Sequence, residues 1–141
     1  MTVLADTPVW SLFFRRPKTH LSPGEQAIRN ELAELIQEQR AQLIGPVRQE
    51  VLSGLREEAH FRRLRHSLRA FPDPEITIED YELAAEYSNR CRAFGIVGST
   101  TDVLICAVAA RRDWRIFTTD RDFSGYAHHL PIALYRPRGN R

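Results

Sequence analysis

The sequence has few cysteines and no long apolar run, and both shortages narrow the class of protein. Cys91 and Cys106 are the only cysteines among 141 residues, and no Cys/His spacing typical of a metal site is present. Both fall inside helical patterns, which predicts small buried core residues. No stretch of about 18 consecutive apolar residues exists, and the N-terminus lacks the basic-then-apolar layout of a signal peptide. We therefore expect a cytoplasmic protein without a membrane partner.

Lysine is almost missing as well. Lys18 is the only lysine among the 20 basic residues, and the net charge of +2 is too small to indicate a nucleic-acid-binding protein by itself. Arginine suits phosphate recognition because its planar fork makes paired hydrogen bonds. Arginine-biased codon usage and solvated surfaces explain the arginines equally well. Basic residues gather in four runs: Arg15-Arg16-Pro17-Lys18, Arg62-Arg63-Leu64-Arg65, Arg111-Arg112 and Arg136-Pro137-Arg138.

Short apolar runs alternate with helical patterns along a chain of one-domain length, in which 43% of the residues are hydrophobic. Strands are predicted at 3–5, 43–45, 115–118 and 132–135. Helices are predicted at 10–14, after a capping box at Ser22, from Pro46, at 57–69, between the Thr77 cap and Gly95, and at 99–114. Apolar strands separated by helices indicate an α/β three-layer sandwich, with a mainly parallel sheet of four to five strands flanked by helices.

Five acidic residues follow or interrupt apolar stretches, where a folded protein does not ordinarily place a charge: Asp6, Glu50, Asp102, Asp120 and Asp122. Carboxylates are rarely buried unless they are paired or bind a metal. In open parallel sheets the functional crevice lies outside the carboxyl ends of the strands. We expect Asp6 and Asp120 at or just past strand ends, and Glu50 and Asp102 near the starts of helices leading away from that edge. The acidic residues are therefore predicted to converge on one crevice and to bind a cation.

Each acidic residue also has a structural alternative. Asp6 could cap a helix that starts at Thr7-Pro8, and Asp102 could be a buried cap. The Asp120-Arg-Asp122 segment is also a good loop sequence, and Glu50 could lie on a polar helix face.

Four sequence blocks resemble the signature blocks of PIN-domain ribonucleases, and within that superfamily the VapC-type toxins of bacterial type II toxin–antitoxin pairs. The blocks are Val3-Leu-Ala-Asp-Thr7, Val47-Arg-Gln-Glu-Val-Leu52, Gly98-Ser-Thr-Thr-Asp-Val-Leu-Ile-Cys-Ala107 and Ile116-Phe-Thr-Thr-Asp-Arg-Asp-Phe123. The resemblance runs from residue 3 to about residue 135. It implies a single PIN domain over residues 1–141.

The resemblance also implies a site that holds Mg²⁺ or Mn²⁺, hard cations that prefer oxygen ligands. Asp6 and Asp102 are expected as central ligands, Glu50 and Asp120 as flanking ligands or water-orienting bases, and Asp122 as an assisting residue. Three hydroxyls are expected to bond to the carboxylates or to substrate phosphate: Thr7, Thr101 and Thr119. The basic residues expected to hold the substrate backbone are Arg15, Arg16 and Lys18.

The function implied is that of a metal-dependent endoribonuclease, the toxin of a toxin–antitoxin pair. The expected partners are RNA, a cognate antitoxin and a second copy of the chain, with Trp10, Phe13 and Phe14 as contacts for the dimer or the antitoxin. A stand-alone RNA-processing nuclease and a catalytically silent PIN module are alternatives. A receiver domain of two-component signalling fits poorly, because it needs a lysine after its last strands and Lys18 lies near the other end.

Overall fold

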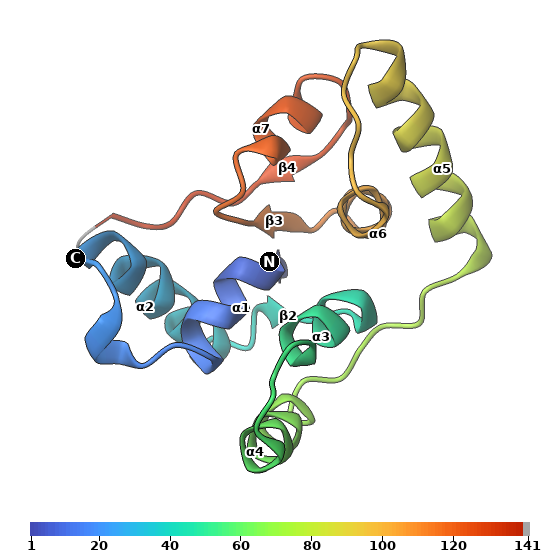
Figure 1. Cartoon of the computed structure of the whole chain (residues 1–141). Coiled ribbons are helices and arrows are strands. Elements are labelled where there is room, and N and C mark those ends of the chain that lie inside the picture. Colours follow the sequence, from blue (N-terminus) through green and yellow to red (C-terminus); the bar gives the residue numbers. More distant parts are fainter. Residues whose placement is uncertain (140–141) are drawn as a thin grey trace.

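The computed structural model describes residues 1–139, apart from the side chain of Lys18. Four parallel strands form one sheet in the order β2-β1-β3-β4: β1 (Val3–Ala5), β2 (Ala41–Gln42), β3 (Arg115–Phe117) and β4 (Ala133–Leu134) (Figure 1). The α/β prediction of a parallel sheet flanked by helices is confirmed. Among the described residues, no helix combines the length and the apolar character needed to cross a membrane.

Seven α-helices and one 3₁₀ turn surround the sheet within residues 1–139. They are α1 (Thr7–Phe14), η1 (Lys18–His20), α2 (Pro23–Gln37), α3 (Gly45–Leu52), α4 (Glu58–Leu68), α5 (Ile78–Ala93), α6 (Thr100–Arg112) and α7 (Asp122–Ala127). The capping boxes predicted at Ser22 and Thr77 are both present. Cys91 and Cys106 are free and buried, as the helical patterns predicted.

Some boundaries differ from the sequence prediction. Strand β2 ends at Gln42, where its pairing with Leu4 of β1 ends. Leu43 and Ile44, predicted as strand, lie after it and are fully buried by packing. Helix α1 starts earlier than predicted, at Thr7, because the Asp6 side chain caps it. No helix was predicted between residues 118 and 132, and α7 forms there from Asp122.

Helix α6 is the buried centre of the fold, and α5 packs alongside it at the outer edge of the molecule (Figure 1). The start of α5 is tied to the end of α6 by Asp80, whose side chain is 0% exposed. Asp80 accepts hydrogen bonds from Arg111 at 2.8 Å and from Arg112 at 2.8 and 2.9 Å. These bonds, with Arg112 the largest influence, hold the pKa of Asp80 well below its usual range.

The expectation that Trp10 is an exposed contact for a partner is wrong. Trp10 is 0% exposed, and its indole N–H donates to the carbonyl oxygen of Ala5 at 3.0 Å. Phe13 and Phe14 are partly buried, and the ring of Phe14 lies edge-on to Phe71. The α1 aromatics therefore anchor this helix to the core, since aromatic side chains bury large areas when they pack together.

Candidate metal centre at the carboxyl edge of the sheet

Asp6 follows directly on β1 and is 4% exposed. One carboxylate oxygen accepts from the backbone N–H of Thr7 at 2.8 Å and so caps α1. The other accepts from the Thr118 hydroxyl at 2.9 Å, just beyond the end of β3. Helix capping therefore uses only one of the two carboxylate oxygens of Asp6. The other oxygen links the end of β1 to the end of the neighbouring strand β3.

Asp120 lies beside Asp6, linked to it through the same threonine. The backbone N–H of Asp120 donates to the Thr118 hydroxyl at 3.0 Å, and Asp120 itself accepts from the backbone N–H of Asp122 at 2.9 Å. One carboxylate oxygen from each of Asp102, Asp120 and Asp122 lies within 4.8 Å of the other two. Three carboxylates thus meet at the start of α6 and the start of α7.

Glu50 lies close enough to this site for its charge to act on Asp6 and Asp102. The Thr7 hydroxyl donates to a Glu50 carboxylate oxygen at 2.6 Å. The expectation that Glu50 lies near the start of its helix is wrong, because it occupies the last turn of α3. It is exposed there, on the side that faces α1.

Asp102 lies in the first turn of α6, where a negative charge suits the helix dipole. The Ser99 hydroxyl accepts from its backbone N–H at 3.0 Å, and the Tyr126 hydroxyl donates to its carboxylate at 2.8 Å. Gly98 makes room for that contact, since a Cβ there would lie 3.3 Å from the Tyr126 oxygen and 3.1 Å from Val103. Ser99 thus holds the backbone of Asp102 and Tyr126 holds its carboxylate.

The cluster is electrostatically strained. Burial raises the pKa of Asp6 to about 6, and the charges of Asp102 and Glu50 add to the rise. Burial also raises the pKa of Asp102, with further contributions from Asp120 and Glu50. The pKa of Tyr126 is raised by burial and by Asp102, which keeps the phenol protonated as a donor. Mutual repulsion of this kind is relieved by a cation.

Only some of the residues expected to hold the substrate lie next to the carboxylates. Thr7 bonds to Glu50, Thr119 is exposed beside Asp120, and Thr101 is half-buried next to Asp102. Arg15 donates to the Ser53 carbonyl oxygen at 3.4 Å, and Arg16 forms an ion pair with Glu25. The side chain of Lys18 lies outside the described part of the structure.

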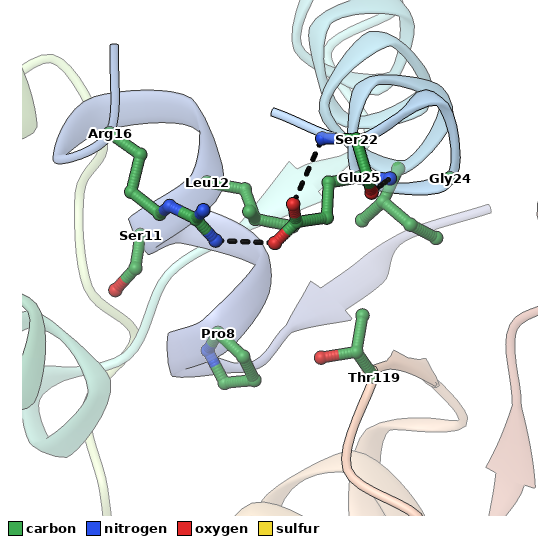
Figure 2. A pocket seen from close by; sticks show the side chains of 9 residues that line it. Pro8, Ser11, Leu12, Arg16, Ser22, Gly24, Glu25 and Thr119 are labelled. Atoms are coloured by element: carbon green, nitrogen blue, oxygen red, sulfur yellow. Dashed lines mark hydrogen bonds and ion pairs between the residues drawn. The ribbon is translucent and has the colours of Figure 1, made fainter. Parts of the chain in front are cut away.

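A cavity of about 540 Å³ opens next to the cluster, between α1, α2 and Thr119. Figure 2 shows Pro8 and Leu12 on one side of it and the Thr119 side chain across from Pro8. Arg16 reaches over the rim to Glu25, which also accepts from the Ser22 backbone N–H at 3.0 Å (Figure 2). The cavity therefore combines apolar walls with a charged rim.

Two residues that hold the carboxylates in place were not predicted from the sequence. They are Thr118, which bonds to Asp6, and Tyr126, which bonds to Asp102. Thr118 is the last residue of the strand predicted at 115–118, so its place at the carboxyl edge was a usable signal. Tyr126 lies 24 residues from Asp102 and carried no such signal.

A parallel sheet whose carboxyl edge carries converging carboxylates places the chain among α/β proteins with an acidic site at that edge. The chain belongs to the PIN domain family, whose model matches residues 3–129. No curated protein matches the sequence.

Solved structures share the fold over nearly the whole chain. FitAcB from Neisseria gonorrhoeae has a TM-score of 0.74 at 20% identity, covering 96% of this chain and 98% of that one. VapBC2 from Rickettsia felis, bound to a DNA fragment from its promoter, has a TM-score of 0.71 at 15% identity, with coverage of 96% and 98%. A toxin–antitoxin complex from Klebsiella pneumoniae has a TM-score of 0.65 at 18% identity, with coverage of 97% and 98%. At these identities the likeness concerns the fold.

Proposed function

We propose that the protein is a metal-dependent endoribonuclease and the toxin of a toxin–antitoxin pair. The observation that carries the proposal is the meeting of Asp102, Asp120 and Asp122 within 4.8 Å beside the buried Asp6, in a chain of the PIN domain family. We also propose that the protein acts in the cytoplasm, where such an RNA substrate would be met.

The donor set fits Mg²⁺ or Mn²⁺. All of the converging groups are carboxylate oxygens, which hard cations prefer, and no cysteine or histidine belongs to the cluster of Asp102, Asp120 and Asp122. Asp6, Asp102 and Asp120 would hold the ion, with the exposed Asp122 assisting and Glu50 at the edge of the site. A bound divalent cation supplies Lewis-acid chemistry for the hydrolysis of a phosphodiester bond.

The protein side chains have distinct tasks in this site. Thr118 and Tyr126 fix the orientation of Asp6 and Asp102 through their hydroxyls. Glu50 is exposed and anchored by Thr7, so its free oxygen can accept a proton from a water that enters from solvent. We therefore assign Glu50 as the general base and Thr119, exposed beside Asp120, as a donor to the substrate phosphate.

Chelation is expected to remove the activity. Purified protein should cleave a generic single-stranded RNA in Mg²⁺ or Mn²⁺ and lose cleavage in excess EDTA, because the carboxylates alone repel the phosphate. Adding back the metal should restore the rate, which controls for irreversible damage. Robust cleavage in EDTA by protein free of other nucleases would contradict the metal-dependent mechanism, and a lack of cleavage with either metal would favour the silent binding module.

An antitoxin is the protein partner that we propose. The structural neighbours named above include toxin–antitoxin complexes. The cavity between α1 and α2 offers apolar walls for a partner helix next to the acidic cluster, to which a basic side chain of the partner would be attracted. A small DNA-binding protein encoded in the adjacent reading frame would support the toxin role, whereas an isolated gene would favour an RNA-processing nuclease.

A homodimer is the second proposed assembly. Ile78 is 74% exposed and Tyr81 is 55% exposed, and a spacing of three residues places them on one side of α5. Light scattering of the purified protein is expected to give twice the mass of one chain, and Ile78→Asp should shift it to the mass of one chain. A single-chain mass for the unmodified protein at micromolar concentration would contradict the dimer.

A further inference from the structure

A second groove, of about 530 Å³, opens from the acidic cluster along the ends of β3 and β4. Thr118 and Asp120, which belong to the cluster, form one end of its lining. Arg121, Tyr135 and Arg136 also line it, together with residues of β3, α7 and β4 and with Pro137. The groove is therefore continuous with the proposed cleavage site and carries positive charge away from it.

Arg121 and Arg136 are both exposed, and neither pairs with a carboxylate in the part of the chain that the structure describes. Arg138, two residues after Arg136, is by contrast engaged with Glu31 at 3.1 Å and with Glu38 at 2.7 Å. The guanidinium groups of Arg121 and Arg136 are thus free to donate hydrogen bonds to a ligand in the groove.

The C-terminal segment that carries Arg136 is fixed on both sides. Tyr135 donates its backbone N–H to the Ile116 carbonyl oxygen at 2.7 Å and its hydroxyl to Glu31 at 2.9 Å. Arg138 donates its backbone N–H to the same buried Glu31 at 2.5 Å. Arg136 therefore stands between two anchored residues, which holds its backbone at the edge of the groove.

Two of the basic residues predicted from the sequence to hold the substrate, Arg15 and Arg16, are engaged elsewhere. The guanidinium of Arg15 is directed at the Ser53 carbonyl oxygen, and that of Arg16 is paired with Glu25 on the rim of the other cavity (Figure 2). A phosphate that approaches five carboxylates needs unpaired cations beside its path, because the backbone charge dominates nucleic-acid affinity.

We propose that this groove holds the RNA strand on one side of the cleaved bond, with Arg121 and Arg136 each binding a backbone phosphate. The inference rests on the proposed ribonuclease function and adds to it the path of the substrate. Guanidinium groups suit this task because they bind phosphate oxygens in pairs.

The test is a measurement of RNA binding that does not depend on cleavage. Fluorescence anisotropy with a labelled, short single-stranded RNA of mixed sequence is carried out in Mg²⁺ over a series of KCl concentrations. The parent protein is Asp6→Asn, in which cleavage is expected to be slowed at least about 100-fold, and the test variant adds Arg121→Gln and Arg136→Gln. The charge-matched control adds Arg69→Gln and Arg90→Gln, two exposed arginines on the end of α4 and on α5.

The test variant is expected to bind RNA about tenfold more weakly at moderate salt, because Arg121 and Arg136 are exposed and each exposed charge contact contributes only modestly to affinity. The slope of log Kd against log[KCl] should fall by about 1.4, or about 0.7 for each lost phosphate contact on a single strand. The control should change the slope by less than half of that. The variant with Arg121→Lys and Arg136→Lys should keep the slope and recover part of the affinity, which a merely structural role would not produce.

The groove assignment is overturned if the parent binds RNA and the test variant matches the charge-matched control in affinity and slope. The proposed function then still stands, provided that the unmodified protein cleaves RNA. Absence of both RNA binding by the parent and RNA cleavage by the unmodified protein would overturn the proposed function, and the groove assignment with it.

Discussion

Asp6→Asn and Asp102→Asn are each expected to reduce RNA cleavage at least about 100-fold, because a lost metal ligand removes several kcal/mol of transition-state stabilisation. The fold should survive both changes. Asparagine caps a helix as well as aspartate does, so the bond from the Thr7 N–H to residue 6 is kept. The Tyr126 hydroxyl can likewise donate to the amide oxygen of an asparagine at position 102.

Both variants are expected to melt at the same temperature as the unmodified protein or higher when EDTA is present. The pKa of Asp6 is raised to about 6 in the folded state, so the folded state binds more protons than the unfolded state between roughly pH 4 and 6. Stability of the metal-free protein therefore falls as the pH rises through that window. The advantage of Asp6→Asn should be largest near pH 7 and should shrink toward pH 4.

Two further variants provide comparisons for the cleavage and melting results at positions 6 and 102. Asp122→Asn should have a milder effect on cleavage, since Asp122 is exposed and is expected only to assist. Asp113→Asn is the matched control, because Asp113 ends α6 in the left-handed conformation that asparagine also tolerates. Large and equal losses of melting temperature in the variants at positions 6, 102 and 122 would contradict the metal-site assignment and indicate structural caps.

The same substitution tests the toxin role in cells. Expression of the unmodified protein in a bacterial host without a cognate antitoxin should stop growth, whereas expression of Asp6→Asn to the same level should not. Normal growth with abundant unmodified protein would count against the toxin function while leaving the nuclease assay unaffected.

Asp80→Asn is expected to lower stability by about 3 to 5 kcal/mol, the usual cost of removing one partner of a buried ion pair. Asp80 is 0% exposed and compensates both Arg111 and Arg112, so its loss leaves two guanidinium groups near the α5–α6 contact without a counter-charge. A loss of this size corresponds to a fall in melting temperature of roughly 10 to 20 °C. Thermal unfolding followed by circular dichroism measures it.

The effect of Asp80 should depend on pH in a defined direction. Its folded-state pKa is lowered, chiefly by the hydrogen bond from Arg112, so its contribution is fully present above the unfolded pKa of about 4 and is lost as the pH falls below it. The difference in stability between the unmodified protein and Asp80→Asn should therefore be large at pH 7 and smaller below pH 4. Glu82→Gln, an exposed change on the same helix, is the control. A loss below about 1 kcal/mol at pH 7 would contradict the importance of this ion pair, since that is the range of surface pairs.

The fold class and the segments from which the site is built could be predicted from the residue pattern alone. Apolar strands separated by helices require a parallel sheet covered by helices, and the carboxyl ends of such strands share one edge. The positions of Asp6 and Asp120 at that edge followed from this rule. Local signals also fixed the caps at Ser22 and Thr77, because a capping box is formed within one turn of the chain.

How the acidic residues meet, and which side chains surround them, depends on long-range packing and could not be predicted from local patterns. Thr118 joins Asp6 to Asp120, and Tyr126 joins α7 to Asp102, through contacts between residues distant in sequence that no local pattern encodes. Packing also buries Trp10. It pairs Arg138 with Glu31 and leaves the nearby Arg136 exposed, without a carboxylate partner among the described residues. Sequence periodicity tells which face of an element is apolar, but which partner covers a given side chain depends on how the elements pack in three dimensions.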